Sequence, residues 1–178
     1  MSNRRQWTAV VGTVMAIGFG LAFAIKIRPQ IALLGVGSRA PDFPAMHLTA
    51  DRPATFAEHR GHVVLLNIWA TWCQPCRVEM PAIERLSRKF AGTDFRVVAV
   101  SIDKDGPEVV MEFVKELGLT FEIWHDRSGD IQRIYQTTGV PETFVIDREG
   151  VIIKKVIGAA EWDSPVNEIL IRRLLDAR

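Results

Sequence analysis

The order of apolar and polar residues after position 38 predicts a regular alternation of strands and helices. Continuous apolar runs, such as residues 63–69, are typical of strands buried on both faces, and apolar residues at helical spacing follow several of them. The expected strands cover residues 43–48, 54–57, 63–69, 95–102, 121–124, 143–147 and 151–157, and the expected helices cover residues 74–90, 107–117, 128–135 and 164–178. This order favours an α/β fold with a mixed central sheet and helices on both of its faces.

Turn residues support the boundaries of these elements. The first two expected strands pair as a hairpin around Asp51-Arg52-Pro53, and the last two pair across Arg148-Glu149-Gly150. Pro107 begins a helix at a position where a missing backbone N–H costs little. We therefore expect one domain that contains a hairpin near each of its ends.

The amino-terminal segment departs from this pattern, because residues 7–25 contain no charged side chain. Two arginines precede this stretch, and a lysine and an arginine follow it. About twenty apolar residues span a bilayer as a helix, so this segment is long enough. We expect one transmembrane helix, with residues 1–28 as the membrane anchor or signal segment, 29–37 as a tether and 38–178 as the domain.

Two other interpretations of the apolar segment stay open. Ala22-Phe23-Ala24 has the small-x-small form of a signal-peptidase site, so the segment can also be a cleaved signal peptide. A buried core helix is the third interpretation, but several glycines and the lack of a polar face argue against it. The uncleaved anchor is favoured because the apolar stretch is long for a signal peptide.

The orientation of the anchor is inferred from its short tail. The basic residues on the two sides are equal in number, so the positive-inside rule does not discriminate. A short tail with two arginines most simply stays in the cytoplasm, which places the domain in the periplasm beyond the bacterial inner membrane. The cysteine content agrees, because a single pair avoids wrong disulfides in an oxidising compartment.

The charge balance is uneven along the chain. The formal net charge is +1, but the first 37 residues hold four basic side chains and no acidic one, which leaves the remainder with a net charge of −3. A mildly acidic domain gives no electrostatic reason to expect nucleic-acid binding. The 178 residues are near the usual size of one domain, and 48% of them are hydrophobic, which is ample for a core.

Cys73 and Cys76, the two cysteines of the chain, stand at the junction between an expected strand and an expected helix. The unpaired backbone N–H groups and the positive dipole end of that helix would stabilise a thiolate. Thiolate is the nucleophile in disulfide exchange, and the short spacing keeps the second sulfur close enough to resolve a mixed disulfide. We expect Cys73 to be the exposed nucleophile and Cys76 to be the more buried resolving cysteine.

Two structural interpretations of this pair have less support. A zinc site would need four ligands, usually with a second cysteine pair or a histidine pair. Of the four histidines, only His59 and His62 lie close together in the sequence. A purely structural disulfide across so short a loop would remove little entropy from the unfolded chain. Redox chemistry is therefore favoured, and we expect no metal at this site.

Three motifs resemble the thioredoxin superfamily, and most closely its membrane-anchored TlpA-, ResA- and DsbE (CcmG)-like branch. They are residues 37–43 (GSRAPDF), 67–81 (NIWATWCQPCRVEMP) and 139–147 (GVPETFVID). The resemblance covers about residues 36–176. It implies a thioredoxin-like fold with an amino-terminal hairpin and an inserted strand and helix, and the activity of a thiol–disulfide oxidoreductase.

The resemblance also implies roles for residues around the dithiol. Cys73 would attack a substrate disulfide, and Cys76 would resolve the mixed disulfide. Pro141 is expected to be cis and to face the dithiol, whereas an ordinary trans turn proline is the alternative. The backbone of Val140 is expected to pair with an extended substrate segment. The further residues expected to contact the substrate are Trp72, Gln74, Pro75 and Glu142.

The proton-transfer group of thioredoxins is replaced in this chain. Asn67 takes the place of their buried aspartate, and an amide cannot titrate. ResA-like and DsbE-like members share this feature, and some carry an acid three residues after the second cysteine. That position is Glu79 here, which we expect to be a catalytic carboxylate. The alternative is a solvated glutamate that pairs with Arg77 or Arg85.

These features predict a membrane-tethered, periplasmic protein disulfide reductase that needs no cofactor. Its substrates would be exported proteins with disulfides, apocytochrome c among them, and a membrane thiol transporter would supply its electrons. A reductant or copper-handling assembly factor for another periplasmic metalloprotein is the alternative, although the Cys-x-x-x-Cys spacing of a copper module is absent. A peroxiredoxin-like peroxidase is disfavoured because the chain has no Thr-x-x-Cys motif. The client and the oligomeric state stay open.

Overall fold

The computed structural model describes residues 34–177, together with Trp7, residues 13–15 and Gly18. The strands of the domain are β1 (Pro44–His47), β2 (Arg52–Thr55), β3 (Val63–Trp69), β4 (Phe95–Ser101), β5 (Glu122–His125), β6 (Glu142–Ile146) and β7 (Ile152–Ile157). Its helices are α2 (Gln74–Lys89), α3 (Pro107–Leu117), α4 (Asp130–Ile134) and α5 (Pro165–Asp176), with a short 3₁₀ helix η1 (Phe56–His59). Each expected strand and helix is confirmed with both ends within two residues, and η1 is an addition.

The strands form one mixed sheet in the order β2-β1-β5-β4-β3-β6-β7. β3, β4 and β5 are parallel, because α2 and α3 return the chain to the same end of the sheet. The two hairpins add antiparallel strands at its sides, with β1 paired to β5 and β6 paired to β3. The predicted mixed sheet with an amino-terminal hairpin is confirmed.

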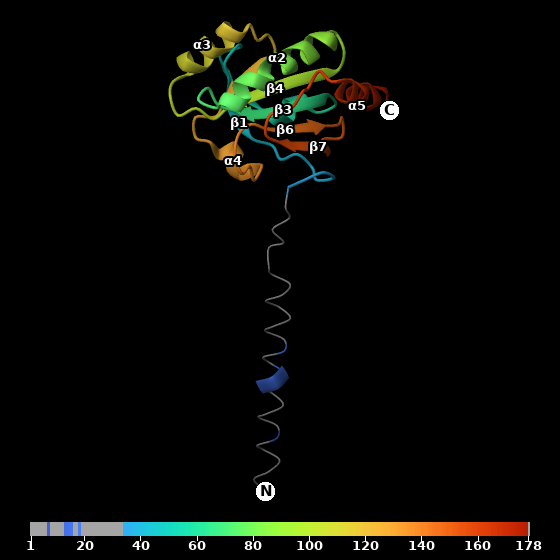
Figure 1. Ribbon diagram of the computed structural model, residues 1–178. Helices are drawn as coiled ribbons and strands as arrows, with labels where there is room; N and C mark the ends of the chain where they lie inside the picture. The colour runs from blue at the N-terminus through green and yellow to red at the C-terminus, as the bar shows by residue number, and fades with distance from the viewer. Residues whose placement is uncertain (1–6, 8–12, 16–17, 19–33, 178) are drawn as a thin grey trace. The chain divides into compact units, whose positions relative to one another are not determined.

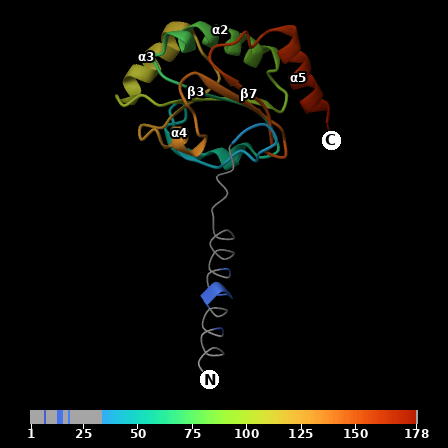
Figure 2. The same ribbon diagram turned by 60° about the horizontal axis from the view of Figure 1, so that its bottom comes forward.

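Helices cover both faces of this sheet (Figures 1 and 2). α2, α3 and α5 lie on one face, and α4 lies on the other. The connections β3–α2–β4 and β4–α3–β5 advance across the sheet in the same direction. Right-handed crossovers of this kind place their helices on the same face, which is why α2 and α3 lie side by side.

β3 is a central strand of the sheet, and each of its residues is buried. That burial accounts for its continuous apolar run, because a strand covered by helices on both faces has no side exposed to water. The polar residue of the strand, Asn67, is fully buried as well. β3 therefore carries an amide into the core where α2 packs.

Aromatic contacts fix the start of the domain. The ring of Phe43 lies 5.5 Å from that of Phe56, 5.9 Å from that of Trp124 and 5.6 Å from that of Tyr135, measured between centroids. The hydroxyl of Tyr135 donates a hydrogen bond to the backbone oxygen of Pro41 at 2.8 Å. The segment that precedes β1 is thereby attached to the core.

The predicted transmembrane helix over residues 7–25 lies mostly outside the described residues. Of that stretch, Trp7, residues 13–15 and Gly18 are described, and they are helical. Among all the residues that the structure describes, no helix is both long and apolar enough to cross a membrane. The anchor therefore stays a prediction.

Candidate functional site

The two cysteines form a disulfide at the start of α2. Cys73 is the N-cap of the helix, and its Sγ accepts a hydrogen bond from the backbone N–H of Cys76 at 3.1 Å. The exposed fraction is 4% for Cys73 and 0% for Cys76. Cys76 is the more buried of the two, as expected. The expectation that Cys73 is exposed is wrong for this disulfide form, because the S–S bond holds its sulfur against a fully buried neighbour.

The first turn of α2 is suited to a thiolate at Cys73. A backbone N–H group already points at the sulfur, and the positive end of the helix dipole lies at the same place. The first turn holds no acidic side chain that would repel a negative charge. A helix N-terminus of this kind lowers the free energy of a thiolate, which is the reactive form of cysteine.

Strand register brings Pro141 to the dithiol. β6 runs antiparallel to β3, and its first residue, Glu142, pairs with Ile68 near the end of β3. The Val140–Pro141 peptide bond is cis, as predicted. It therefore lies beside the carboxyl end of β3, where the loop that leads to Cys73 begins.

The predicted substrate-contacting residues near the dithiol lie mostly on the surface. Trp72 is 68% exposed, Gln74 and Pro75 are exposed, and Val140 is half-buried. They belong to the loop after β3, to the start of α2 and to the loop before β6, which meet at this end of the sheet. They are accessible to a partner, and their contact with one stays a prediction.

Glu79 is a buried carboxylate of the site, because only 2% of its surface is exposed. Its Oε1 accepts a hydrogen bond from Asn67 Nδ2 at 2.8 Å. Its Oε2 accepts bonds from Trp162 Nε1 at 3.2 Å and from the backbone N–H of Ala160 at 3.3 Å. Burial raises the pKa of Glu79 above its ordinary value, and the three hydrogen bonds offset this only in part.

The two arginines considered as partners of Glu79 bind other acids. Arg77 Nη1 lies 2.7 Å from Glu116 Oε1, and Arg85 Nε lies 2.6 Å from Asp163 Oδ2. The interpretation of Glu79 as a solvated glutamate paired with an arginine is therefore wrong. Its hydrogen bonds come instead from neutral donors inside the protein.

Asn67 joins Glu79 to the sheet. Its Nδ2 donates to Glu79 Oε1 and to Thr143 Oγ1, both at 2.8 Å, so this amide connects α2 through β3 to β6. Glu79 stands three residues after Cys76, and residues at this spacing share one face of a helix. The carboxylate and the resolving cysteine are therefore on the same buried face of α2, as a proton acceptor for Cys76 requires.

Glu142 lies inside the protein rather than at the rim of the site. Its side chain is fully buried, and its Oε1 lies 2.8 Å from Lys155 Nζ of β7. Its Oε2 accepts a hydrogen bond from the backbone N–H of Thr138 at 3.3 Å. This corrects the expectation that Glu142 contacts the substrate. A buried carboxylate with these partners anchors the loop before Pro141 and does not reach the surface.

Asp103 is a further buried carboxylate, which neither motif nor periodicity indicated. It follows β4, and it accepts hydrogen bonds from the backbone N–H of Thr71 at 3.0 Å and from Thr71 Oγ1 at 2.6 Å. Because Thr71 lies in the loop between β3 and Cys73, Asp103 fixes the loop that carries the nucleophile. The sequence feature that could have indicated Asp103 is its place after a buried strand, because α/β proteins build their sites at the carboxyl ends of such strands.

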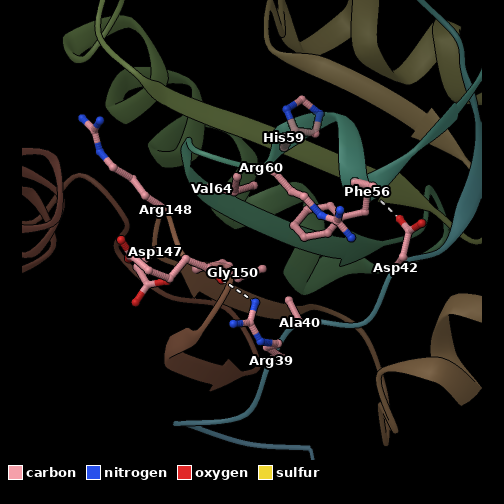
Figure 3. A pocket seen from close by; sticks show the side chains of 13 residues that line it. Arg39, Ala40, Asp42, Phe56, His59, Arg60, Val64, Asp147, Arg148 and Gly150 are labelled. Atoms are coloured by element: carbon pink, nitrogen blue, oxygen red, sulfur yellow. Dashed lines mark hydrogen bonds between the residues drawn. The ribbon is translucent and has the colours of Figure 1, made fainter. Parts of the chain in front are cut away.

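A separate cavity of about 170 Å³ lies at the opposite end of β3 (Figure 3). Val64, near the start of β3, and Ile146, at the end of β6, are among its lining residues. Arg39 also lines it and donates a hydrogen bond to the backbone oxygen of Glu149 at 3.0 Å. Neither cysteine lines this cavity, so it is not part of the redox site.

Comparison with known proteins also points to thiol–disulfide exchange. A family model described as Redoxin matches residues 35–170. The thiol-disulfide oxidoreductase ResA of Oceanobacillus iheyensis is 30% identical over 165 residues, which are 90% of this chain and 85% of that protein. The thiol-disulfide oxidoreductase ResA of Geobacillus thermodenitrificans is 36% identical over 160 residues, which are 87% of this chain and 90% of that protein.

Solved structures share the fold. A protein of Chlorobium tepidum assigned as thiol:disulfide interchange protein DsbE superposes with a TM-score of 0.72 at 32% sequence identity. The superposition covers 80% of this chain and 99% of that one. The likeness thus extends over nearly the whole described domain.

Proposed function

This chain belongs to the Redoxin family and to the ResA- and DsbE-like thiol–disulfide oxidoreductases of the thioredoxin superfamily, and we propose that it reduces disulfides of exported proteins, apocytochrome c among them. One observation carries the proposal: a disulfide at the start of α2 shares its helix with a buried carboxylate. In its reduced form the cysteine pair supplies two electrons for disulfide reduction, and the carboxylate supplies a proton acceptor.

The proposed reaction passes two electrons from the dithiol to the client. Cys73, as a thiolate, attacks one sulfur of the client disulfide, and the other client sulfur leaves as a thiolate that takes up a proton from water. Cys76 then attacks the sulfur of Cys73, the mixed disulfide breaks, and the second client sulfur is released. The product is the Cys73–Cys76 disulfide that the structure contains. Both electrons come from the thiols, so no cofactor is needed.

Glu79 is the proposed proton acceptor of the second step. Cys76 must lose its proton before it can attack, and Glu79 lies one helical turn away on the same buried face. A carboxylate with a raised pKa is better matched to a thiol than an ordinary glutamate is. The proton leaves Cys76 as its sulfur becomes nucleophilic, and Glu79 holds it while the second client sulfur is released.

The proposed direction is reduction of the client. A strong oxidant such as DsbA has a potential of about −120 mV, against about −270 mV for thioredoxin, and the gap corresponds to about 7 kcal/mol for two electrons. An oxidant of that strength needs extra stabilisation of its reduced form. Asn67 is uncharged, and Arg77, the first cation after Cys73, is paired with Glu116 at 2.7 Å. Neither supplies a stabilisation of that size. The Gln74-Pro75 pair also resembles reducing members of the family.

The proposed place of action is the periplasmic side of the inner membrane. Residues 7–25 would hold the chain there as a single-pass anchor, which their lack of charge supports. A reductant in an oxidising compartment must be recharged, so a membrane thiol transporter would return the disulfide to the dithiol after each cycle. The restriction to one cysteine pair supports this compartment.

Trapping of the mixed disulfide tests the proposal. Cys76→Ser should accumulate mixed disulfides with clients, because the first bond forms and the resolving thiol is missing. Cys73→Ser is the matched control and should accumulate none. Both variants are compared after acid quenching by non-reducing electrophoresis, with mass spectrometry of the captured proteins.

The captured proteins then decide the client. Apocytochrome c among them supports a role in cytochrome c maturation. Capture of other exported proteins without it would contradict that role and keep the reductase activity. Equal capture by Cys73→Ser and Cys76→Ser would contradict the assignment of Cys73 as the nucleophile.

A further inference from the structure

The cavity of about 170 Å³ at the start of β3 lies outside the redox site, and we call it the β3 cavity. Val64 lines it near the start of the strand, whereas the loop to Cys73 begins after Trp69 at the other end. Five residue steps along a strand separate the two positions, which is about 16 Å. The β3 cavity is therefore a second site, for which the thiol chemistry gives no use.

The inner wall of the β3 cavity is apolar. It includes Phe56, Val64 and Ile146, which are 7%, 1% and 1% exposed. The ring of Phe56 is fixed by stacking on that of Phe43, with 5.5 Å between the centroids. An apolar cavity of about 150 Å³ is large enough to bind benzene. The β3 cavity therefore has room for one phenyl or branched aliphatic group.

The rim of the β3 cavity offers a cation and an anion with free hydrogen-bonding capacity. Arg60 is exposed, and no described residue forms a hydrogen bond or ion pair with its guanidinium. Asp42 Oδ1 accepts a bond from the backbone N–H of Ala57 at 2.8 Å, and no described residue donates to its Oδ2. The backbone N–H of Arg60 donates to the oxygen of Ala57 at 3.3 Å. Arg60 and Asp42 thus border the same part of the rim.

The other charged lining residues do not make the rim a site for a simple anion. Arg148 points away from the cavity (Figure 3), and its Nη2 lies 3.1 Å from Asp94 Oδ2. Arg39 remains as a second cation, but Asp147 and Glu149 also line the cavity as anions. A rim with both signs gives no net attraction to a lone carboxylate. It complements a ligand that carries both charges.

The β3 cavity is formed before any ligand binds. The backbone N–H of Ala40 donates to the oxygen of Gly150 at 2.8 Å, which ties the entry segment to the turn between β6 and β7. The N–H of Gly61 donates to the oxygen of Arg148 at 3.2 Å, which ties the segment after η1 to the same turn. A preformed cavity avoids the entropy cost of ordering its walls on binding.

We propose that the β3 cavity binds a free α-amino acid with an apolar side chain. The side chain packs on the inner wall beside Phe56, the carboxylate accepts hydrogen bonds from the guanidinium of Arg60, and the ammonium donates to Asp42 Oδ2. Arginine suits this role because its planar fork matches a carboxylate. The proposal does not rest on the proposed function, because neither cysteine lines the cavity.

Four probe ligands test this inference by calorimetric titration of the purified full chain. L-Phenylalanine carries both charges, its amide lacks the anion, and N-acetyl-L-phenylalanine lacks the cation. L-Alanine keeps both charges but has no ring. At about pH 6 the free amino groups stay protonated. L-Phenylalanine should bind with a Kd below about 1 mM. The amide and the N-acetyl derivative should each bind about fivefold more weakly, and L-alanine at least about tenfold more weakly.

Two rim variants should each remove one of these preferences. Arg60→Gln should bind phenylalanine and its amide equally and keep the preference over the N-acetyl derivative. Asp42→Asn should do the reverse, and its amide oxygen can still accept the bond from Ala57. Arg173→Gln and Asp105→Asn are matched controls, because both residues are exposed and neither lines the cavity. They should keep both preferences, and all four variants should reduce hydroxyethyl disulfide at the parental rate.

The other outcomes would overturn the proposal. A parent that binds phenylalanine no more tightly than alanine would remove the apolar wall as the site of the side chain. Unchanged preferences in Arg60→Gln and Asp42→Asn would remove these residues from the site. An equal loss of all ligands in both variants would mean that the two side chains support the cavity without contacting a ligand. Tighter binding of the N-acetyl derivative than of phenylalanine would make the cavity a site for simple carboxylates.

Discussion

Glu79→Gln isolates the charge of the buried carboxylate from its shape. The glutamine oxygen can accept the hydrogen bonds from Trp162 and Ala160, and its NH₂ group then faces Asn67. Among the described residues, Asn67 Oδ1 has no hydrogen-bond partner. If the amide of Asn67 turns over, Oδ1 can accept bonds from the new NH₂ group and from the hydroxyl of Thr143. The variant should therefore keep the hydrogen bonds at position 79, while the NH₂ group of Asn67 moves to the place of an oxygen without a partner, at a cost that does not depend on pH.

The effect on stability should depend on pH, because burial raises the pKa of Glu79 in the folded protein. Glutamate in an unfolded chain has a pKa of about 4.3. Between this value and the raised folded pKa, the folded protein holds more protons than the unfolded chain. The stability of the parent is therefore complete below the unfolded pKa and falls as the pH rises through the folded pKa. The loss is about 1.4 kcal/mol for each unit between the two pKa values.

Denaturant unfolding of the oxidised protein at a series of pH values measures this effect, with the disulfide intact so that no thiol titrates. The free energy of unfolding of Glu79→Gln, relative to that of the parent, should rise from acid to neutral pH. The matched control is Glu161→Gln, the same change at an exposed position, which should follow the parent throughout. A Glu79→Gln variant that differs from the parent by a constant amount at every pH would refute the reasoning, because the buried charge would then carry no penalty.

Three other outcomes can be measured on the same protein. Lys155→Met should lower the free energy of unfolding by about 3–5 kcal/mol, because it leaves the buried Glu142 carboxylate without its cationic partner. Adding Glu142→Gln to this variant should recover most of the loss. Parental stability of Lys155→Met alone would contradict this. Equilibration with glutathione should give a potential near the value of about −270 mV for thioredoxin, whereas a value above about −160 mV would make the protein an oxidase or isomerase. Intact-mass analysis of the membrane fraction should show the uncleaved chain, and a mass that matches cleavage after Ala24 would replace the anchor with a signal peptide.

Most elements of the fold were predictable because their signals are local. The run at residues 63–69 reads as a buried strand, and the structure buries it on both faces. Turn residues and apolar spacing placed the remaining ends within two residues. The dithiol and the cis bond before Pro141 were likewise predictable, because each belongs to a contiguous motif. The pairing of β6 with β3, which brings these two motifs together, follows from the fold that the motifs imply.

The buried acids were not predictable in the same way. Glu142 and Asp103 are fully buried, yet Glu142 is the first residue of β6 and Asp103 follows β4, positions where sequence alone allows a carboxylate to point outward. Glu142 pairs with Lys155 of the next strand, and Asp103 binds Thr71 in a loop that is distant in the sequence. A tertiary hydrogen bond or ion pair decides whether each acid is buried, and the apolar periodicity of the sequence does not show such a contact. Sequence patterns fail at such positions because function or anchoring, rather than amphipathicity, selects the residue.

The clearest failure of amphipathic reasoning is the adjacent pair Val78 and Glu79. The valine is 67% exposed and the glutamate is 2% exposed, which reverses the arrangement that apolar burial favours. Leaving a valine in water forgoes about 1.5–3 kcal/mol, and burying a carboxylate adds a further cost. Neighbouring helical residues project about 100° apart, so one turn of α2 presents an apolar surface outward and a titratable group inward. This reversal costs stability, and the inward carboxylate is the proton acceptor that we propose for Cys76.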